Sequence, residues 1–172
     1  VLRVPREENS NWSTPYLWEN DQRTEIVTPG SGLVRSYDLD GNVLWSFKGM
    51  SAITIATPYA AHGLLYVSSG YVGDKRRPLY ATRPGATGDI TLEPGQTSNT
   101  WIAWSHPKAA PYNPTSLVYG DRLYVLYDRG EVASFNAMDG TVVYERTRIP
   151  DGGTYSASPW AYGGNGFCLN ED

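Results

Sequence analysis

Short apolar segments rich in Val, Tyr, Trp and Thr alternate along the chain with turns that carry Gly or Asp-Gly. Residues of these types favour β-strands, and Asp-Gly suits tight hairpin turns because both residues tolerate positive φ angles. No segment shows a sustained helical spacing of its apolar residues. We therefore predict an all-β fold built from short strands joined by tight turns.

One pattern recurs: a small hydroxyl residue, a proline or second small residue, a short apolar run, a turn and an apolar strand. It occupies residues 57–67, 115–125 and 158–168 without gaps, and a copy with a longer turn spans 14–27. The units follow one another at intervals of about 43 residues, except that the second unit carries about 15 additional residues. Four short strands repeated every ~40–45 residues are typical of a β-propeller blade.

The repeats predict a single, partial β-propeller domain over residues 1–172, with blades of four antiparallel strands. We expect about three complete blades plus parts of flanking ones, at approximately 13–48, 56–105, 114–146 and, incomplete, 156–172. Leu2 to Val4 is expected to be the last strand of a preceding blade. Propellers close with ~4–8 blades, so three possibilities stay open. The chain is a piece of a longer propeller, copies of it assemble into a ring, or its N-terminal strand completes a small ring.

The second half of each unit resembles the PQQ-like, quinoprotein-type β-propeller repeat. The blade of that family ends in a pattern close to Ala-Tyr-Asp-x-x-Thr-Gly-x-x-x-Trp. Residues 36–45 follow it with one deletion, and residues 134–144 follow it at full length with Tyr in place of Trp. The resemblance implies that Trp45, Trp104 and Tyr144 pack onto the Gly-bearing turn of a neighbouring blade. It also implies a bacterial, extracytoplasmic setting, periplasmic or secreted, as for quinoprotein dehydrogenases and the propeller lipoprotein of outer-membrane assembly.

Composition and charge narrow the possible partners. The net charge is −4 without an acidic or basic block, so no electrostatic footprint for nucleic acid is predicted. No apolar run approaches ~20 residues, so no transmembrane segment is predicted. The single cysteine, Cys168, excludes an internal disulfide and is expected to be a small buried residue within a strand.

Residues that could act in catalysis or bind a metal do not form a recognisable motif in the sequence. His62 is expected to be a turn residue of the repeat, and His106 a solvated loop residue. The acidic residues fall mostly at turns, where Asp bonds its own nearby backbone. We therefore assign no catalytic, cofactor-binding or metal-binding residue from the sequence.

The insertion in the second unit is the main departure from the repeat. It contains the cations Lys75, Arg76 and Arg77 next to Tyr71, a combination that could bind an acidic partner or a sugar acid. A second long loop, from residue 89 to residue 99, is rich in Gly, Pro, Thr and Ser. Long loops on a rigid scaffold are where binding usually resides.

Three functions stay open. The first is a non-catalytic propeller module that acts as a binding or scaffold surface for a protein or polysaccharide, without a cofactor. The second, implied by the resemblance, is a fragment of a quinoprotein dehydrogenase that holds PQQ and Ca²⁺, although the vicinal Cys-Cys pair of many members is missing. The third is a carbohydrate-binding or carbohydrate-active propeller, in which Tyr and Trp stack on sugars. Further blades would come from the same longer chain or from self-association.

Overall fold

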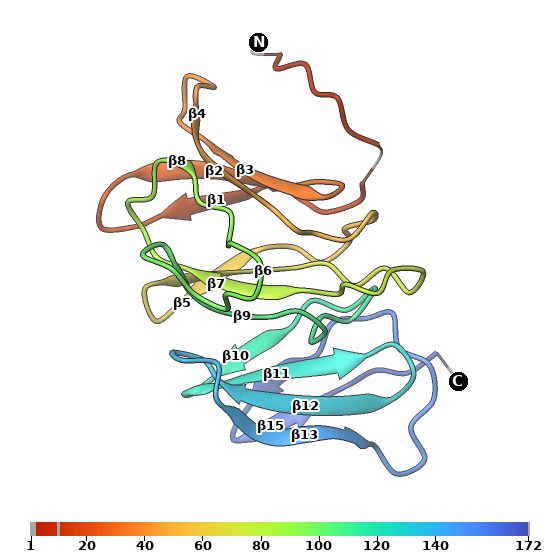
Figure 1. Ribbon diagram of the computed structural model, residues 1–172. Helices are drawn as coiled ribbons and strands as arrows, with labels where there is room; N and C mark the ends of the chain where they lie inside the picture. Colours follow the sequence, from red (N-terminus) through yellow and green to blue (C-terminus); the bar gives the residue numbers. More distant parts are fainter. Residues whose placement is uncertain (1–2, 10, 172) are drawn as a thin grey trace.

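The computed structural model describes residues 3–9 and 11–171, which form fifteen β-strands and, within those ranges, no helix (Figure 1). Accordingly, the described residues contain no helix with the length and apolar character needed to cross a bilayer. The strands group into sheets in chain order, and each of the first three sheets contains a meander of four antiparallel strands. The prediction of an all-β fold of propeller blades is confirmed.

The strands have the following bounds. The first blade contains β1 (Tyr16–Glu19), β2 (Thr24–Pro29), β3 (Leu33–Tyr37) and β4 (Val43–Lys48). The second contains β5 (Tyr59–Ala61), β6 (Leu64–Ser68), β7 (Leu79–Thr82) and β9 (Ile102–His106), with the short β8 (Gly88–Asp89) between the last two. The third contains β10 (Leu117–Tyr119), β11 (Arg122–Tyr127), β12 (Glu131–Asn136) and β13 (Val142–Arg148). The described part of a fourth blade is the hairpin of β14 (Trp160–Tyr162) and β15 (Asn165–Phe167).

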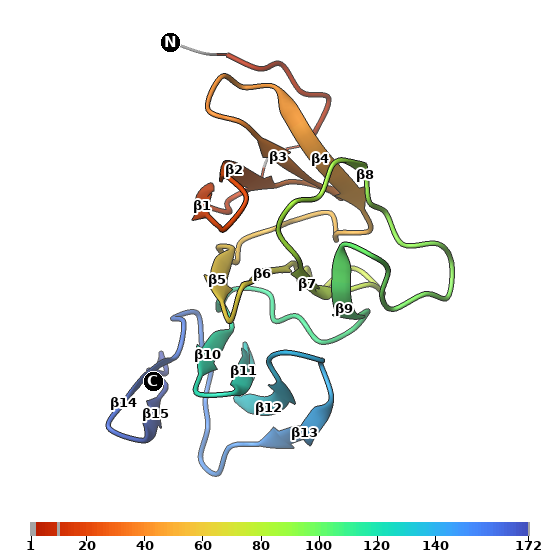
Figure 2. The ribbon, with the colours of Figure 1, turned by 90° about the vertical axis from the view of Figure 1, so that its left-hand side faces the viewer.

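The three complete blades stack in chain order, from the first at the top of Figure 1 to the third at the bottom. Figure 2 shows the first strands β1, β5, β10 and β14 along one side of the stack, and the last strands β4, β9 and β13 along the other. Loops that follow equivalent strands therefore project from equivalent places of successive blades.

Most of the core lies between adjacent blades. Leu65 and Val67 of β6 belong to an apolar cluster shared with the first blade, whereas Leu64 and Tyr66 belong to a cluster shared with the third. Successive side chains of a strand point to opposite faces, so one strand contributes to two cores. Every residue of β6 is buried as a result.

The strands of the three complete blades pair in equivalent register at one aromatic position. The pairs are Ser36 with Trp45, Ala81 with Trp104 and Ser134 with Tyr144. In each blade the ladder shifts register immediately after that pair. The three aromatic residues therefore occupy the same place in the repeat.

The connection between β7 and β9 of the second blade crosses over to the first blade. We call residues 83–90 the crossing arm. Within it, β8 pairs in parallel with β4, with Gly88 opposite Trp45. The amide of Ile90 then donates to the carbonyl oxygen of Ser46 at 2.9 Å. This pairing satisfies backbone groups that an open outer edge would leave free. Asp89, which the sequence predicts as the start of a long loop, is therefore the end of a fifth strand on the first blade.

The N-terminal segment differs from its prediction. Leu2 lies outside the described residues, and Arg3 and Val4 belong to no strand. Side chains hold the segment against the first blade: the guanidinium of Arg6 lies 5.3 Å from the ring centroid of Tyr37.

Candidate functional site

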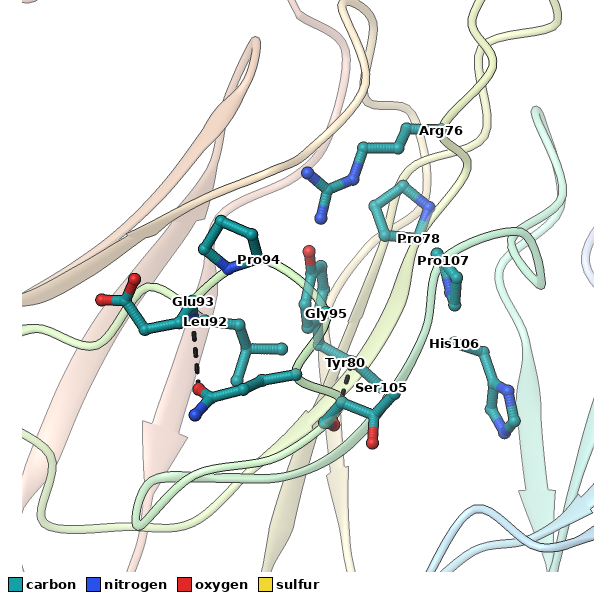
Figure 3. A pocket seen from close by; sticks show the side chains of 12 residues that line it. Arg76, Pro78, Tyr80, Leu92, Glu93, Pro94, Gly95, Ser105, His106 and Pro107 are labelled. Atoms are coloured by element: carbon teal, nitrogen blue, oxygen red, sulfur yellow. Dashed lines mark hydrogen bonds between the residues drawn. The ribbon is translucent and has the colours of Figure 1, made fainter.

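The two long connections of the second blade meet at one edge of the molecule. We call residues 71–78, between β6 and β7, the basic loop, and residues 89–99, which run from the end of β8 toward β9, the long loop. A cavity of about 410 Å³ lies between them and is also lined by the start of β7 and the end of β9 (Figure 3).

The basic loop is anchored at both of its ends. Near its start, the Oδ2 atom of Asp74 accepts a hydrogen bond of 2.6 Å from the amide of Ala52. At its end, the amide of Arg77 donates to the carbonyl oxygen of Pro107, and the amide of Ala110 donates to the carbonyl oxygen of Arg77, each at 2.9 Å. The loop is therefore fixed to the segment that leaves β9.

The long loop is held by its own side chains. The Oδ1 atom of Asn99 accepts hydrogen bonds from the amides of Trp101 and Ile102, and its Nδ2 atom donates to the carbonyl oxygen of Ile90 at 3.0 Å. At the start of the loop, hydrogen bonds from Thr91 lower the pKa of the Asp89 carboxyl. Asx-type bonds of this kind order a loop that has no regular pairing along most of its length.

Arg76 and Tyr80 converge at one end of the cavity. A methyl group placed on Gly49 would lie 2.8 Å from the Tyr80 hydroxyl oxygen and 3.1 Å from a terminal nitrogen of Arg76. Burial raises the pKa of the Tyr80 hydroxyl, while the charge of Arg76 opposes the shift. Tyr80 therefore stays protonated at neutral pH and can donate a hydrogen bond.

The four residues predicted as an interaction loop have different surroundings. Arg76 lines the cavity, whereas the ring of Tyr71 packs against Tyr112 with 5.6 Å between centroids. Lys75 is exposed and does not line the cavity. Arg77 is half-buried, and its Nε atom has no hydrogen-bond partner among the described residues. The structure thus brings one of the four to the cavity.

Sequence reasoning missed two of the residues that shape this cavity. Tyr80 belongs to β7. An aromatic residue within a strand is expected to be a core residue, so the sequence does not indicate that Tyr80 lines a cavity. Leu92 carries a weak signal, because an apolar residue stands out in a loop that is otherwise mostly polar. Neither signal indicates which distant segment completes the cavity.

The prediction for His106 is wrong. His106 is the last residue of β9, and its Nε2 atom donates to the carbonyl oxygen of Gly140 at 2.6 Å. Its ring also lies 4.7 Å from the ring of Phe135, between centroids. The β12–β13 turn of the third blade covers this histidine, so it is a contact between blades and not a solvated loop residue.

The prediction for Cys168 is also wrong. The strand that precedes it ends at Phe167, and Cys168 is exposed. Partial burial nevertheless raises the pKa of its thiol.

His62, as predicted, lies in a turn, with a φ of 52°, and its Nε2 atom donates to the carbonyl oxygen of Gly120 at 2.8 Å. His62 therefore also links its blade to the next.

The predicted docking aromatics lie in three different settings. Trp104 packs on the next blade, where a methyl group on Gly140 would lie 2.7 Å from its ring. Trp45 donates from Nε1 to the buried carboxylate of Glu25 in its own blade at 2.6 Å, and the crossing arm lies alongside it. Tyr144 lines an apolar cavity of about 290 Å³ between the third blade and the β14–β15 hairpin. The docking role of the three stays a prediction.

Acidic side chains at the turns bond to their own turns. Asp38 accepts hydrogen bonds from Asn42, and Asp139 accepts them from Thr141, and these bonds lower the pKa of both carboxyls. Within residues 3–9 and 11–171, no three His, Cys, Asp or Glu side chains come together as a group that could hold a metal ion.

Comparisons with known proteins agree with the fold. Neither a family model nor a curated protein matches the sequence. Among solved structures, the chain is similar to the crystal structure of BamB from Moraxella catarrhalis, with a TM-score of 0.51 and 14% sequence identity. The similarity covers 82% of this chain and 37% of that chain, so the present chain spans little more than a third of that structure. At this level of identity the likeness concerns the fold alone.

Proposed function

We propose that the chain is a non-catalytic binding module of PQQ-like β-propeller repeats, which presents the basic loop and the long loop to a protein partner outside the cytoplasm. Residues 1–172 act in this proposal as one propeller domain, combined with further blades from a longer chain or from self-association. The observation that carries the proposal is the meeting of two anchored loops around a cavity on a rigid sheet. Loops held in this way lose little conformational freedom when they bind.

The cavity favours binding over catalysis because its reactive side chains are engaged in the fold. The hydroxyl of Ser105 donates to the carbonyl oxygen of Thr97 at 3.0 Å. The Nε2 atom of His106 donates to the carbonyl oxygen of Gly140. A nucleophile and a general base need hydrogen-bond contact with each other or with a substrate. Ser105 and His106 instead direct these atoms to backbone carbonyls.

The dehydrogenase alternative requires PQQ beside a calcium ion. Calcium in proteins takes six to eight oxygen ligands, among them several carboxylates. The described residues bring no three His, Cys, Asp or Glu side chains together, so we propose no residue of this chain as a ligand of such an ion. We assign no reaction step to PQQ in this chain.

Site-specific photo-crosslinking tests the proposed binding surface. A photoreactive residue at Thr97 of the long loop or at Lys75 of the basic loop should give the same covalent adduct in the periplasmic or secreted fraction, identifiable by mass spectrometry. Met138, an exposed residue in the β12–β13 turn, is the matched control position and should give no such adduct. Equal labelling from all three positions, or adducts from Met138 alone, would contradict the proposed surface.

A further inference from the structure

Arg76, which forms no ion pair with any described residue, stands at one end of the cavity between the basic loop and the long loop. The described residues form three ion pairs, and Arg76 takes part in none of them. Glu93 lines the same cavity, but Figure 3 shows its carboxylate pointing away from Arg76. The guanidinium is therefore available to an external anion.

A second donor lies beside this cation. The side chain of Tyr80 is 2% exposed, and its hydroxyl reaches the carbonyl oxygen of Gly49 only at 3.5 Å, the long limit of a hydrogen bond. A buried hydroxyl with so weak a bond gains free energy from a better acceptor. Arg76 and Tyr80 both line the cavity, and a terminal nitrogen of Arg76 and the Tyr80 hydroxyl oxygen both lie close to Gly49, so one group bound in the cavity could accept hydrogen bonds from both.

The remaining walls near these donors are apolar and stiff. Pro78, Pro94 and Pro107 contribute rings whose backbone φ angles are fixed, and Leu92 points its side chain toward Tyr80 in Figure 3. Such walls can cover a small apolar body without losing much conformational entropy. A cavity of about 410 Å³ is within the range of small-molecule sites.

We propose that this cavity binds the carboxylate of a ligand that has a short, branched apolar body. Arg76 and the Tyr80 hydroxyl donate to the carboxylate, because a guanidinium presents donors in the planar arrangement that a carboxylate accepts. Leu92 and the proline rings contact the apolar body. The inference rests on the proposed function, since it names the ligand chemistry of the same surface. Two sources share this chemistry: a free short-chain acid, and the C-terminal carboxylate of a peptide that ends in leucine.

Calorimetric titration of the purified chain separates these sources. The probes are 4-methylpentanoate and a tetrapeptide with a free C-terminal leucine, each compared with its own amide. We expect at least one acid to bind. Its amide should bind more weakly by a factor of about ten or greater, because the amide lacks the charge. Binding of the peptide alone indicates a protein C-terminus, and binding of the free acid alone indicates a small molecule.

Variants then locate the binding. Arg76→Gln should lower the affinity for the acid about tenfold. Tyr80→Phe should lower this affinity by a smaller factor, because the ring remains. Arg122→Gln is the matched control: it makes the same substitution at an exposed arginine at the start of β11, which does not line the cavity. Thermal unfolding of each variant checks that the fold is retained.

Three outcomes overturn the inference. Neither acid binds, the amide binds as well as its acid, or Arg122→Gln weakens binding as much as Arg76→Gln does. In these cases the crosslinks from Thr97 and Lys75 can still form, so a failed ligand class is distinguishable from a failed binding surface. Absence of the crosslinks together with acid-specific binding would instead contradict the protein partner and leave the carboxylate site standing.

Discussion

The backbone amide of Thr57 donates a hydrogen bond of 3.1 Å to the hydroxyl oxygen of Thr115, which holds the equivalent position in the next blade. The amide of Thr115 in turn donates to the hydroxyl oxygen of Ser158 at 2.9 Å. The small hydroxyl residues at the start of the third and fourth repeats thus link equivalent positions of successive blades. Their recurrence in the sequence has this physical reason.

Replacing Thr115 by Val should destabilise the contact between the second and third blades. The change keeps the shape of the side chain but leaves the amide of Thr57 without its acceptor, at a cost of about 1–2 kcal/mol. Urea unfolding measures the loss. Thr115→Ser keeps the hydroxyl and should restore most of the stability, whereas Thr87→Val, at an exposed position, should change little. Equal losses for Val and Ser at position 115 would contradict the link.

Gly140→Ala tests the packing of Trp104. Gly140 has a φ of 75°, and the new methyl group would also meet the Trp104 ring. Gly32→Ala is the matched control, because Gly32 has a φ of 77° and open space around the added methyl group. We expect the variant at Gly140 to lose about 1–3 kcal/mol more than the control, from overpacking alone. Equal free energies of unfolding for the two variants would show that Trp104 does not dock there.

The crossing arm should contribute to the stability of the first blade. The side chain of Ile90 is 3% exposed and packs in the core of that blade. Ile90→Ala should therefore cost about 2–4 kcal/mol, and the amide of Lys48, which donates to Thr91 Oγ1, should exchange its hydrogen faster. Leu39→Ala, at an exposed turn position, is the control. Unchanged exchange at Lys48 in the Ile90 variant would mean that the arm contributes little to holding this edge.

Tyr66 should make the stability depend on alkaline pH. Its hydroxyl donates to the carbonyl oxygen of Ala137 in the third blade, and burial raises its pKa from 10.0 to about 12. Above pH 10 the unfolded chain loses this proton while the folded chain keeps it, so the stabilisation is complete below pH 10 and is lost as the pH rises toward 12.

The phenylalanine variant tests this dependence. Tyr66→Phe should make the fall in the free energy of unfolding between about pH 10 and about pH 12 less steep than in the parent chain. Urea unfolding at several pH values measures the slope. Tyr162→Phe, at an exposed position, should leave the slope unchanged. A parent slope that persists in the Tyr66 variant would rule out this residue as the source.

Local patterns in the sequence determined the strands, the turns and the position of the repeated aromatic residues. Strand and turn preferences depend on neighbouring residues in the chain. The sequence alone therefore predicted that Trp45, Trp104 and Tyr144 occupy the same position in the repeat. The structure gives these three residues the same register but different surroundings. The surroundings depend on which neighbour follows each blade.

Only the tertiary structure decided what covers each of these local elements. His106 is a contact between blades because Gly140 reaches it, and Arg76 differs from Lys75 because Tyr80 and the long loop close a cavity beside it. The crossing arm pairs with the first blade because the outer edge of β4 was open. These relationships join residues far apart in the chain, and no local spacing of residue types encodes them.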